Sequence, residues 1–255
     1  MTAGSAVADD KPRNAQTVKA LLKLREMVLN GELPPGERVA ELNIVERLGV
    51  SRTPIRMALV RLEEEGLVDC LATGGFVVRE FSDQDIADSI ELRGTMEGMA
   101  ARRAAERRPD RAELAEIRDC VGSLDALIRR RELSMDDFSD YIRLNDRFHS
   151  LLVELAASAV LKRSIERILH LPFASPNAFV FVQSELPESR EILSIAQEHH
   201  RSILEAIEHG EGGRAEALAR EHSRIAQRNL QIALSNQQQR HRIPGASLIR
   251  QRERA

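Results

Sequence analysis

The chain is poor in aromatic residues, cysteine, glycine and proline. Its 255 residues include no tryptophan, one tyrosine and two cysteines, Cys70 and Cys120, which form no CxxC motif. That usage indicates a reducing compartment and no disulfide framework. No stretch approaches the roughly 20 apolar residues of a membrane span, and residues 1–10 carry two acids without a long apolar run, unlike a signal peptide. We therefore expect a cytoplasmic protein with no membrane partner.

The residues that are abundant favour helices. Alanine, leucine, isoleucine, glutamate and arginine dominate, and 255 residues suffice for two modest domains or one large domain. The net charge of −3 means that any nucleic-acid site must be a local basic patch. One such patch exists, because residues 38–62 contain five arginines and only two glutamates.

Hydrophobic spacing predicts three helices and a hairpin in the first 80 residues. The helices cover 16–29, 41–48 and 52–65. A turn at Ala72-Thr73-Gly74 then separates two short β-like runs. Three helices and a two-stranded ribbon make a winged helix-turn-helix over residues 15–80, preceded by a flexible segment, 1–14.

Beyond residue 81 the pattern becomes entirely helical. Helices are predicted over 83–107, 110–131, 135–157, 159–170, 188–209 and 213–237. The fold class is therefore mainly α, with an all-helical second domain over 81–237. Residues 238–255 are rich in glutamine and arginine, and we predict that they form a flexible tail.

The run Leu48-Gly49-Val50-Ser51-Arg52-Thr53-Pro54-Ile55-Arg56 is typical of a helix that reads DNA. A helix ends at the glycine, Ser51 caps the next helix, and Arg52 and Arg56 follow on one face. Arginine can donate two hydrogen bonds to guanine in the major groove, while Ser51 and Thr53 have hydroxyls suited to phosphate. Two arginines alone would fit a solvated helix face better than a DNA-reading face.

Other motifs in the same region decide between these alternatives. They occur in the order Gly-Glu-Leu-Pro-Pro-Gly-Glu-Arg-Val (31–39), the run above, Ala-Leu-Val-Arg-Leu (58–62), Glu-Gly-Leu-Val (65–68) and Gly-Gly-Phe-Val-Val (74–78). Residues 16–80 thus resemble the N-terminal domain of the GntR family of bacterial transcription regulators. The resemblance implies that Arg52 and Arg56 contact bases of double-stranded DNA, with Ser51 and Thr53 in support. Met57 departs from the glutamate usual in the family.

Three further residues complete the predicted DNA interface. Arg38 belongs to the basic patch, and Thr73 and Gly74 lie at the turn of the predicted wing. A small residue there would let the wing tip approach the DNA backbone or the minor groove.

Three histidines fall on apolar faces of predicted helices. They are His149, His200 and His222, and Asn145 lies one turn before His149. Converging nitrogen and oxygen donors in a helical bundle suit Zn²⁺ or another borderline divalent ion. Spacing alone leaves an equal alternative, in which each is a core histidine with a hydrogen-bond partner.

Residues 83–235 resemble the all-helical FCD effector domain of the FadR-type branch of the same family. The motifs are Glu91-Leu92-Arg93…Glu97, Asn145-Asp146-Arg147-Phe148-His149, His200-Arg201-Ser202-Ile203-Leu204 and Ala217…Glu221-His222. The resemblance implies a metal on the three histidines, expected to be Zn²⁺, with Ni²⁺ or Mn²⁺ as alternatives. The family has an aspartate where this chain has Asn145, so the shell would be neutral and would favour an anion.

The effector is expected to be a small organic acid or another anion. The resemblance places Arg93 in the pocket, where its guanidinium can bind a carboxylate; a surface ion pair with Glu97 is the alternative. Asn145, Glu97 and Phe173 are the other predicted effector residues. The segment 171–187 would be a pocket lid or a packed loop, and it resembles the VanR-type subgroup.

These features predict a homodimeric, ligand-responsive transcriptional regulator, a repressor rather than an activator, which binds an inverted-repeat operator. One alternative is a metal-dependent enzyme that uses the three histidines. Against it, no general base is expected beside the site, because Asp146 would point about 100° away from Asn145 around the helix. A second alternative is a DNA-binding protein whose metal is purely structural.

Overall fold

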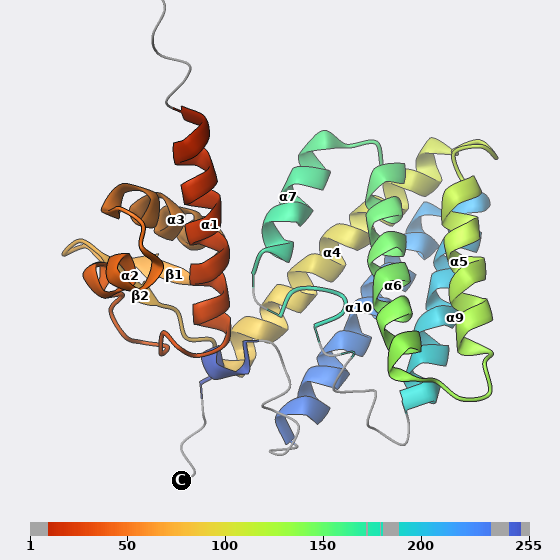
Figure 1. Ribbon diagram of the computed structural model, residues 1–255. Coiled ribbons are helices and arrows are strands. Elements are labelled where there is room, and N and C mark those ends of the chain that lie inside the picture. The colour runs from red at the N-terminus through yellow and green to blue at the C-terminus, as the bar shows by residue number, and fades with distance from the viewer. Residues whose placement is uncertain (1–9, 172, 179, 181–188, 236–244, 251–255) are drawn as a thin grey trace, which may run out of the picture. The chain divides into compact units, whose positions relative to one another are not determined.

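The structure is a computed structural model that describes residues 10–171, 173–178, 180, 189–235 and 245–250. The chain divides into two compact units (Figure 1). The first contains the chain up to Asp83 together with the C-terminal segment, and the second begins at Gln84 and includes the remaining helices.

The first unit is the predicted winged helix-turn-helix. Its elements are α1 (Asp10–Leu29), α2 (Glu41–Leu48), α3 (Arg52–Glu64), β1 (Val68–Cys70) and β2 (Phe76–Val78). The strands are antiparallel, with Val68 opposite Val78. Residues 37–39 run along the other edge of β2, where Val39 N donates to Phe76 O at 2.8 Å. The apolar faces of the three helices form its core, with Leu24, Ile44 and Leu59 almost fully buried.

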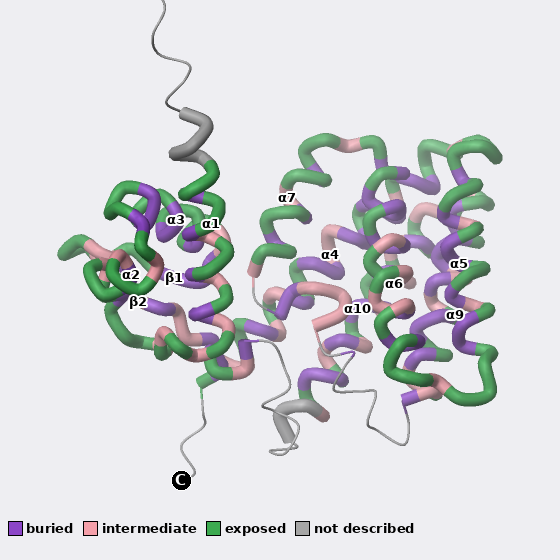
Figure 2. The backbone as a smooth tube through the Cα atoms, viewed as in Figure 1, coloured by how far each residue is buried: buried purple, intermediate pink, exposed green. Residues whose placement is uncertain are grey.

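The second unit is all-helical among its described residues, as predicted. Its helices are α4 (Asp83–Arg107), α5 (Ala115–Ile128), α6 (Met135–Leu155), α7 (Ala159–Leu169), α9 (Ser189–Glu208) and α10 (Gly212–Ser235). Figure 2 shows buried residues along α4, α6 and α9. Leu124, Phe148 and Ile207 belong to one continuous apolar cluster at the centre of the bundle. No described helix is long and apolar enough to cross a membrane.

Two local features explain where α6 begins and how closely α4 packs on α10. Ser134 and Asp137 form a capping box at the start of α6, because the Ser134 side chain accepts from Asp137 N while the Asp137 carboxylate accepts from Ser134 N. Glycines at 94 and 98 let α4 pack closely on α10. A Cβ atom on Gly94 would lie 2.0 Å from Ser223 Oγ, so a larger residue would clash.

The helix ends agree with the predicted ranges to within a few residues, with two exceptions. The predicted helix 110–131 begins at Ala115, because Asp110 Oδ1 accepts hydrogen bonds from Ala112 N and Glu113 N and so holds a turn. The first helix begins at Asp10, so residues 10–14 of the segment predicted to be flexible, 1–14, are helical. Residues 1–9 lie outside the described residues.

Residues 245–250, within the predicted flexible tail 238–255, adopt a defined conformation. A short 3₁₀ helix, η1 (Ala246–Leu248), packs on the first unit, where Leu248 is fully buried. Phe81 N donates to Leu248 O at 2.8 Å, and Arg250 N donates to Phe81 O at 2.8 Å. The apolar side chains of Leu248 and Ile249 provide the reason, since they gain burial against this unit. The remainder of the predicted tail lies outside the described residues.

Candidate DNA interface and metal centre

One face of α3 is buried and the opposite face is cationic. Ile55 and Leu59 are fully buried, whereas Arg52, Thr53 and Arg56 are exposed. The guanidinium of Arg56 lies 3.9 Å from a Glu41 carboxylate oxygen but its side chain is 65% exposed, so the ion pair leaves its donors open to solvent. The helix therefore presents two arginine side chains away from its own core.

Ser51 occupies the N-cap position of α3, as predicted, but its side chain makes no capping hydrogen bond. Its hydroxyl is exposed at a helix N-terminus, beside Thr53. Such a position suits a phosphate oxygen, because the first N–H groups of a helix lack partners within the helix.

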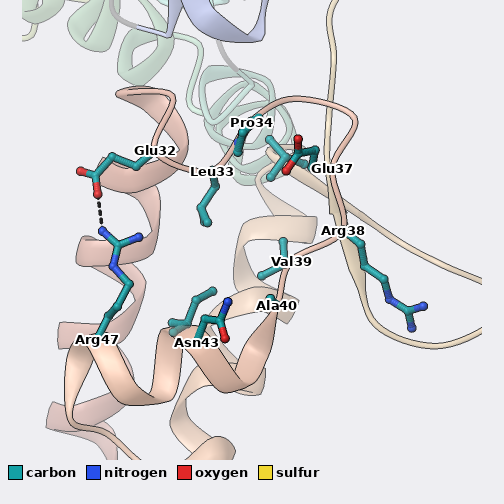
Figure 3. Close-up of a pocket in the computed structure, with 11 residues that line it drawn as sticks. Glu32, Leu33, Pro34, Glu37, Arg38, Val39, Ala40, Asn43 and Arg47 are labelled. Carbon is teal, nitrogen blue, oxygen red and sulfur yellow. Dashed lines mark hydrogen bonds and ion pairs between the residues drawn. The ribbon is translucent and has the colours of Figure 1, made fainter.

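The wing is held by an arginine from the segment before α2. Arg38 Nη2 donates to Gly74 O at 2.5 Å. Gly74 and Gly75 have φ near +83° and +85°, the left-handed region that favours glycine. Arg38 is among the residues that line a cavity of about 230 Å³, and Figure 3 shows its side chain directed away from Glu32 and Arg47, which form an ion pair. Arg38 is thus tied to the wing tip that also carries the exposed Thr73.

Three buried histidines converge in the second unit. His149 lies on α6, His200 on α9 and His222 on α10, and one nitrogen of each lies within 4.8 Å of the others. His200 Nε2 and His222 Nε2 are 3.1 Å apart. Two nitrogen ligands about 2.1 Å from one metal ion are about 3.0–3.4 Å apart, so this spacing suits a shared ion.

The polar atoms around these histidines are incompletely hydrogen-bonded, which also fits a metal. Asn145 Nδ2 donates to Asn177 Oδ1 at 2.9 Å, whereas Asn145 Oδ1 is buried without a hydrogen-bond partner. Nε2 of His149 and Nδ1 of His222 also lack a hydrogen bond among the described residues. Buried polar atoms are normally paired. Imidazole nitrogens and oxygen atoms are both ligands that Zn²⁺ accepts.

The protonation states favour metal binding. Burial lowers the pKa of both His200 and His222 well below the ordinary value, so these imidazoles are neutral. A neutral imidazole is the form that coordinates a metal.

Arg93 and Glu97 form a buried ion pair beside His149. Arg93 Nη1 lies 3.0 Å from Glu97 Oε2, and both side chains are 2% exposed. Glu97 Oε1 lies 3.0 Å from His149 Nδ1. Burial raises the pKa of Glu97, but the charge of Arg93 and the contact with His149 outweigh burial and lower the pKa to about 2. Arg93 therefore pairs with Glu97, as the alternative prediction held, but the pair is buried and does not lie on the surface.

A cavity of about 440 Å³ borders His149. Glu97, Lys162, Ser175 and Pro176 are among the residues that line it. Phe173, predicted to contact the effector, is buried but is not among the described residues that line this cavity. Residues 172, 179 and 181–188 of the predicted lid lie outside the described residues.

Family models match most of the chain. Residues 15–78 match the model described as bacterial regulatory proteins, gntR family, and residues 88–224 match the FCD domain. The chain belongs to the GntR family and carries an FCD domain. It is a transcriptional regulator of the GntR/FCD type.

Relatives of this GntR-family chain are regulators as well. It is 30% identical to the Nta operon transcriptional regulator of Aminobacter aminovorans, over 71% of this chain and 91% of that protein. It is 31% identical to a probable D-xylose utilization operon transcriptional repressor of Paenarthrobacter nicotinovorans, over 74% and 77% of the two chains. The solved structure of Lar, described as controlling expression of the Listeria monocytogenes agr system, shares the fold with a TM-score of 0.61 at 19% identity, over 91% and 99% of the two chains.

Sequence reasoning missed several residues of this GntR-family site. Asn177 holds Asn145, Lys162 lines the cavity, and Gln197 contacts His200. Asp146 is exposed and lines the same cavity as His149. An exposed carboxylate therefore shares this cavity with His149. None of these four residues stands out by spacing, because each depends on which helices become neighbours.

Proposed function

We propose that this regulator binds an inverted-repeat operator as a homodimer and acts as a repressor. We further propose that a small organic acid, bound at or near a divalent metal ion, changes its affinity for the operator. The proposal rests on one observation, the convergence of three buried histidines, one of which borders a cavity, with an unused Asn145 oxygen one helical turn before His149. Zn²⁺ fits this donor set, with Ni²⁺ or Mn²⁺ as alternatives.

The residues have distinct roles in this proposal. His149, His200, His222 and Asn145 would hold the ion, and none of these four carries a negative charge. Such an ion would attract a carboxylate to its open coordination positions. Lys162 lines the same cavity and supplies a further positive charge for an acid, although it lies 3.6 Å from a Glu154 carboxylate oxygen.

The ion would join three helices, since its ligands come from α6, α9 and α10. An acid can alter DNA binding only through a difference in its affinity for two arrangements of the protein. Coupling of this kind typically changes affinity about 5- to 150-fold.

The test uses the full-length protein and an operator selected from random double-stranded DNA. Operator affinity is measured by fluorescence anisotropy after chelation, after Zn²⁺ loading, and with a panel of aliphatic, hydroxy and aromatic acids. Elemental analysis should find about one metal ion per chain in the natural protein. The metal should be absent from a variant in which His149, His200 and His222 are all replaced by alanine.

The matched control replaces the exposed His170 and His209 by alanine and should keep the metal. Metal retained in full by the triple variant would refute the site. An operator affinity that responds to neither metal nor acids would favour the purely structural metal. Because Asp146 borders the cavity, the same acids should also be followed by NMR, and their consumption would favour the metal-dependent enzyme.

A further inference from the structure

Gln197 is buried on α9, one helical turn before His200. Its side-chain nitrogen, Nε2, donates to the backbone oxygen of Val121 at 3.0 Å and to Asp125 Oδ1 at 2.5 Å. Both of these groups only accept hydrogen bonds. The amide therefore has one possible orientation, with its oxygen directed at His200.

That orientation determines where His200 carries its proton. Gln197 Oε1 lies 3.0 Å from His200 Nδ1. An amide oxygen can only accept, so the neutral imidazole must carry its hydrogen on Nδ1. Its Nε2 is then left with a lone pair, and this nitrogen is the one that faces His222.

Asp125 is held in turn from the surface of the bundle. Arg201 Nη2 lies 2.7 Å from Asp125 Oδ1, and Arg201 Nε also donates to this carboxylate. Burial raises the pKa of Asp125, but hydrogen bonds from Arg201 and Gln197 lower it on balance, so the carboxylate stays charged. A continuous chain of contacts thus runs from Arg201 through Asp125 and Gln197 to His200.

We propose that Gln197 is a positioning residue that fixes His200 in the tautomer whose Nε2 can bind the metal. This inference rests on the proposed metal site. In metal centres, outer hydrogen bonds orient the ligand imidazoles, and their loss typically costs about 10- to 100-fold in metal affinity. The chain offers no other polar contact to His200 Nδ1 among its described residues.

The first measurement needs no metal. Full-length chelated protein is labelled with ¹⁵N-histidine, His200 is assigned from a His200→Asn variant, and its tautomer is determined by long-range ¹H–¹⁵N NMR. The natural protein should show hydrogen on Nδ1 alone. Gln197→Met, which keeps the length but removes both polar groups, should allow the other tautomer. An unchanged tautomer in Gln197→Met would overturn the proposal.

The second measurement is Zn²⁺ affinity, by competition with a chromophoric chelator. Gln197→Met should bind Zn²⁺ about 10- to 100-fold more weakly than the natural protein. Gln227→Met is the matched control, because Gln227 Nε2 donates to Ala87 O on α4 and has no hydrogen bond to a histidine among the described residues; it should bind Zn²⁺ normally.

The outcomes separate the two proposals. Equal Zn²⁺ affinity in Gln197→Met and the natural protein would overturn the positioning role in metal binding. Natural protein that binds no Zn²⁺ at all would refute the metal site itself, and the tautomer measurement would then decide the orientation of His200 by Gln197 independently. Circular dichroism of each variant checks that the helices are retained.

Discussion

Phe81 and Leu248 are joined by a backbone hydrogen bond of 2.8 Å, although the whole helical unit separates them in the sequence. The C-terminal segment is thereby part of the DNA-binding unit. The chain passes between its two units twice, once after Asp83 and once after α10.

Replacing Leu248 by alanine should destabilise the DNA-binding unit by about 2–5 kcal/mol, because the side chain is fully buried. Hydrogen exchange should then be faster at the Phe81 amide, and urea unfolding of the unit should begin earlier. Leu42→Ala is the control within the same unit, since Leu42 is 58% exposed. Equal effects of the two substitutions would show that the segment does not contribute to the core.

Replacing Arg52 or Arg56 by alanine should weaken operator binding by about 1–3 kcal/mol and relax sequence specificity, because each side chain is exposed on the reading face. Fluorescence anisotropy with operator and random DNA measures both effects. Lys23→Ala removes the same charge from α1, and it should leave specificity intact. If operator and random DNA weaken equally in an arginine variant, that arginine does not read bases.

Gly94→Ala should destabilise the helical unit by about 1–3 kcal/mol, because the new Cβ would meet Ser223 Oγ at 2.0 Å. Gly122→Ala is the matched control in α5, where nothing lies within 4 Å, and it should stabilise by about 0.5–1 kcal/mol through helix propensity. Thermal unfolding compares the two. Adding Ser223→Gly to Gly94→Ala should restore part of the lost stability, and no restoration would contradict the proposed clash.

Ser134→Ala should lower the free energy of unfolding by about 0.5–2 kcal/mol, because it removes the N-cap of α6.

The stability contributed by Asp137 should depend on pH, because the hydrogen bonds from Ser134 lower the pKa of Asp137 in the folded protein. The Asp137 carboxylate therefore stabilises the folded protein fully above the ordinary aspartate pKa of about 3.9, and this stabilisation is lost as the pH falls below that value. Urea unfolding at pH 6 and pH 3 should show Asp137→Asn less stable at pH 6, with the difference shrinking at pH 3. Asp136→Asn, at an exposed neighbouring position, should show no such change.

The sequence by itself determined the secondary structure and the nature of the reading helix. Apolar spacing, glycine stops and caps are local signals, so α2, α3 and the described helices of the second unit other than α5 were predicted to within a few residues. Arg52 and Arg56 could be placed on the exposed face for the same reason, because four residues bring side chains to one side of a helix.

Only the tertiary structure decided which side chains meet. His149, His200 and His222 were identified by their apolar faces, but their distances depend on the packing of three helices. The Arg93–Glu97 pair proved to be buried, Asp146 proved to border the cavity, and residues 245–250 returned to the first unit. Gln197 looks like any polar residue in the sequence, because its contacts at Val121 and Asp125 lie on another helix, and no local pattern records which helices become neighbours.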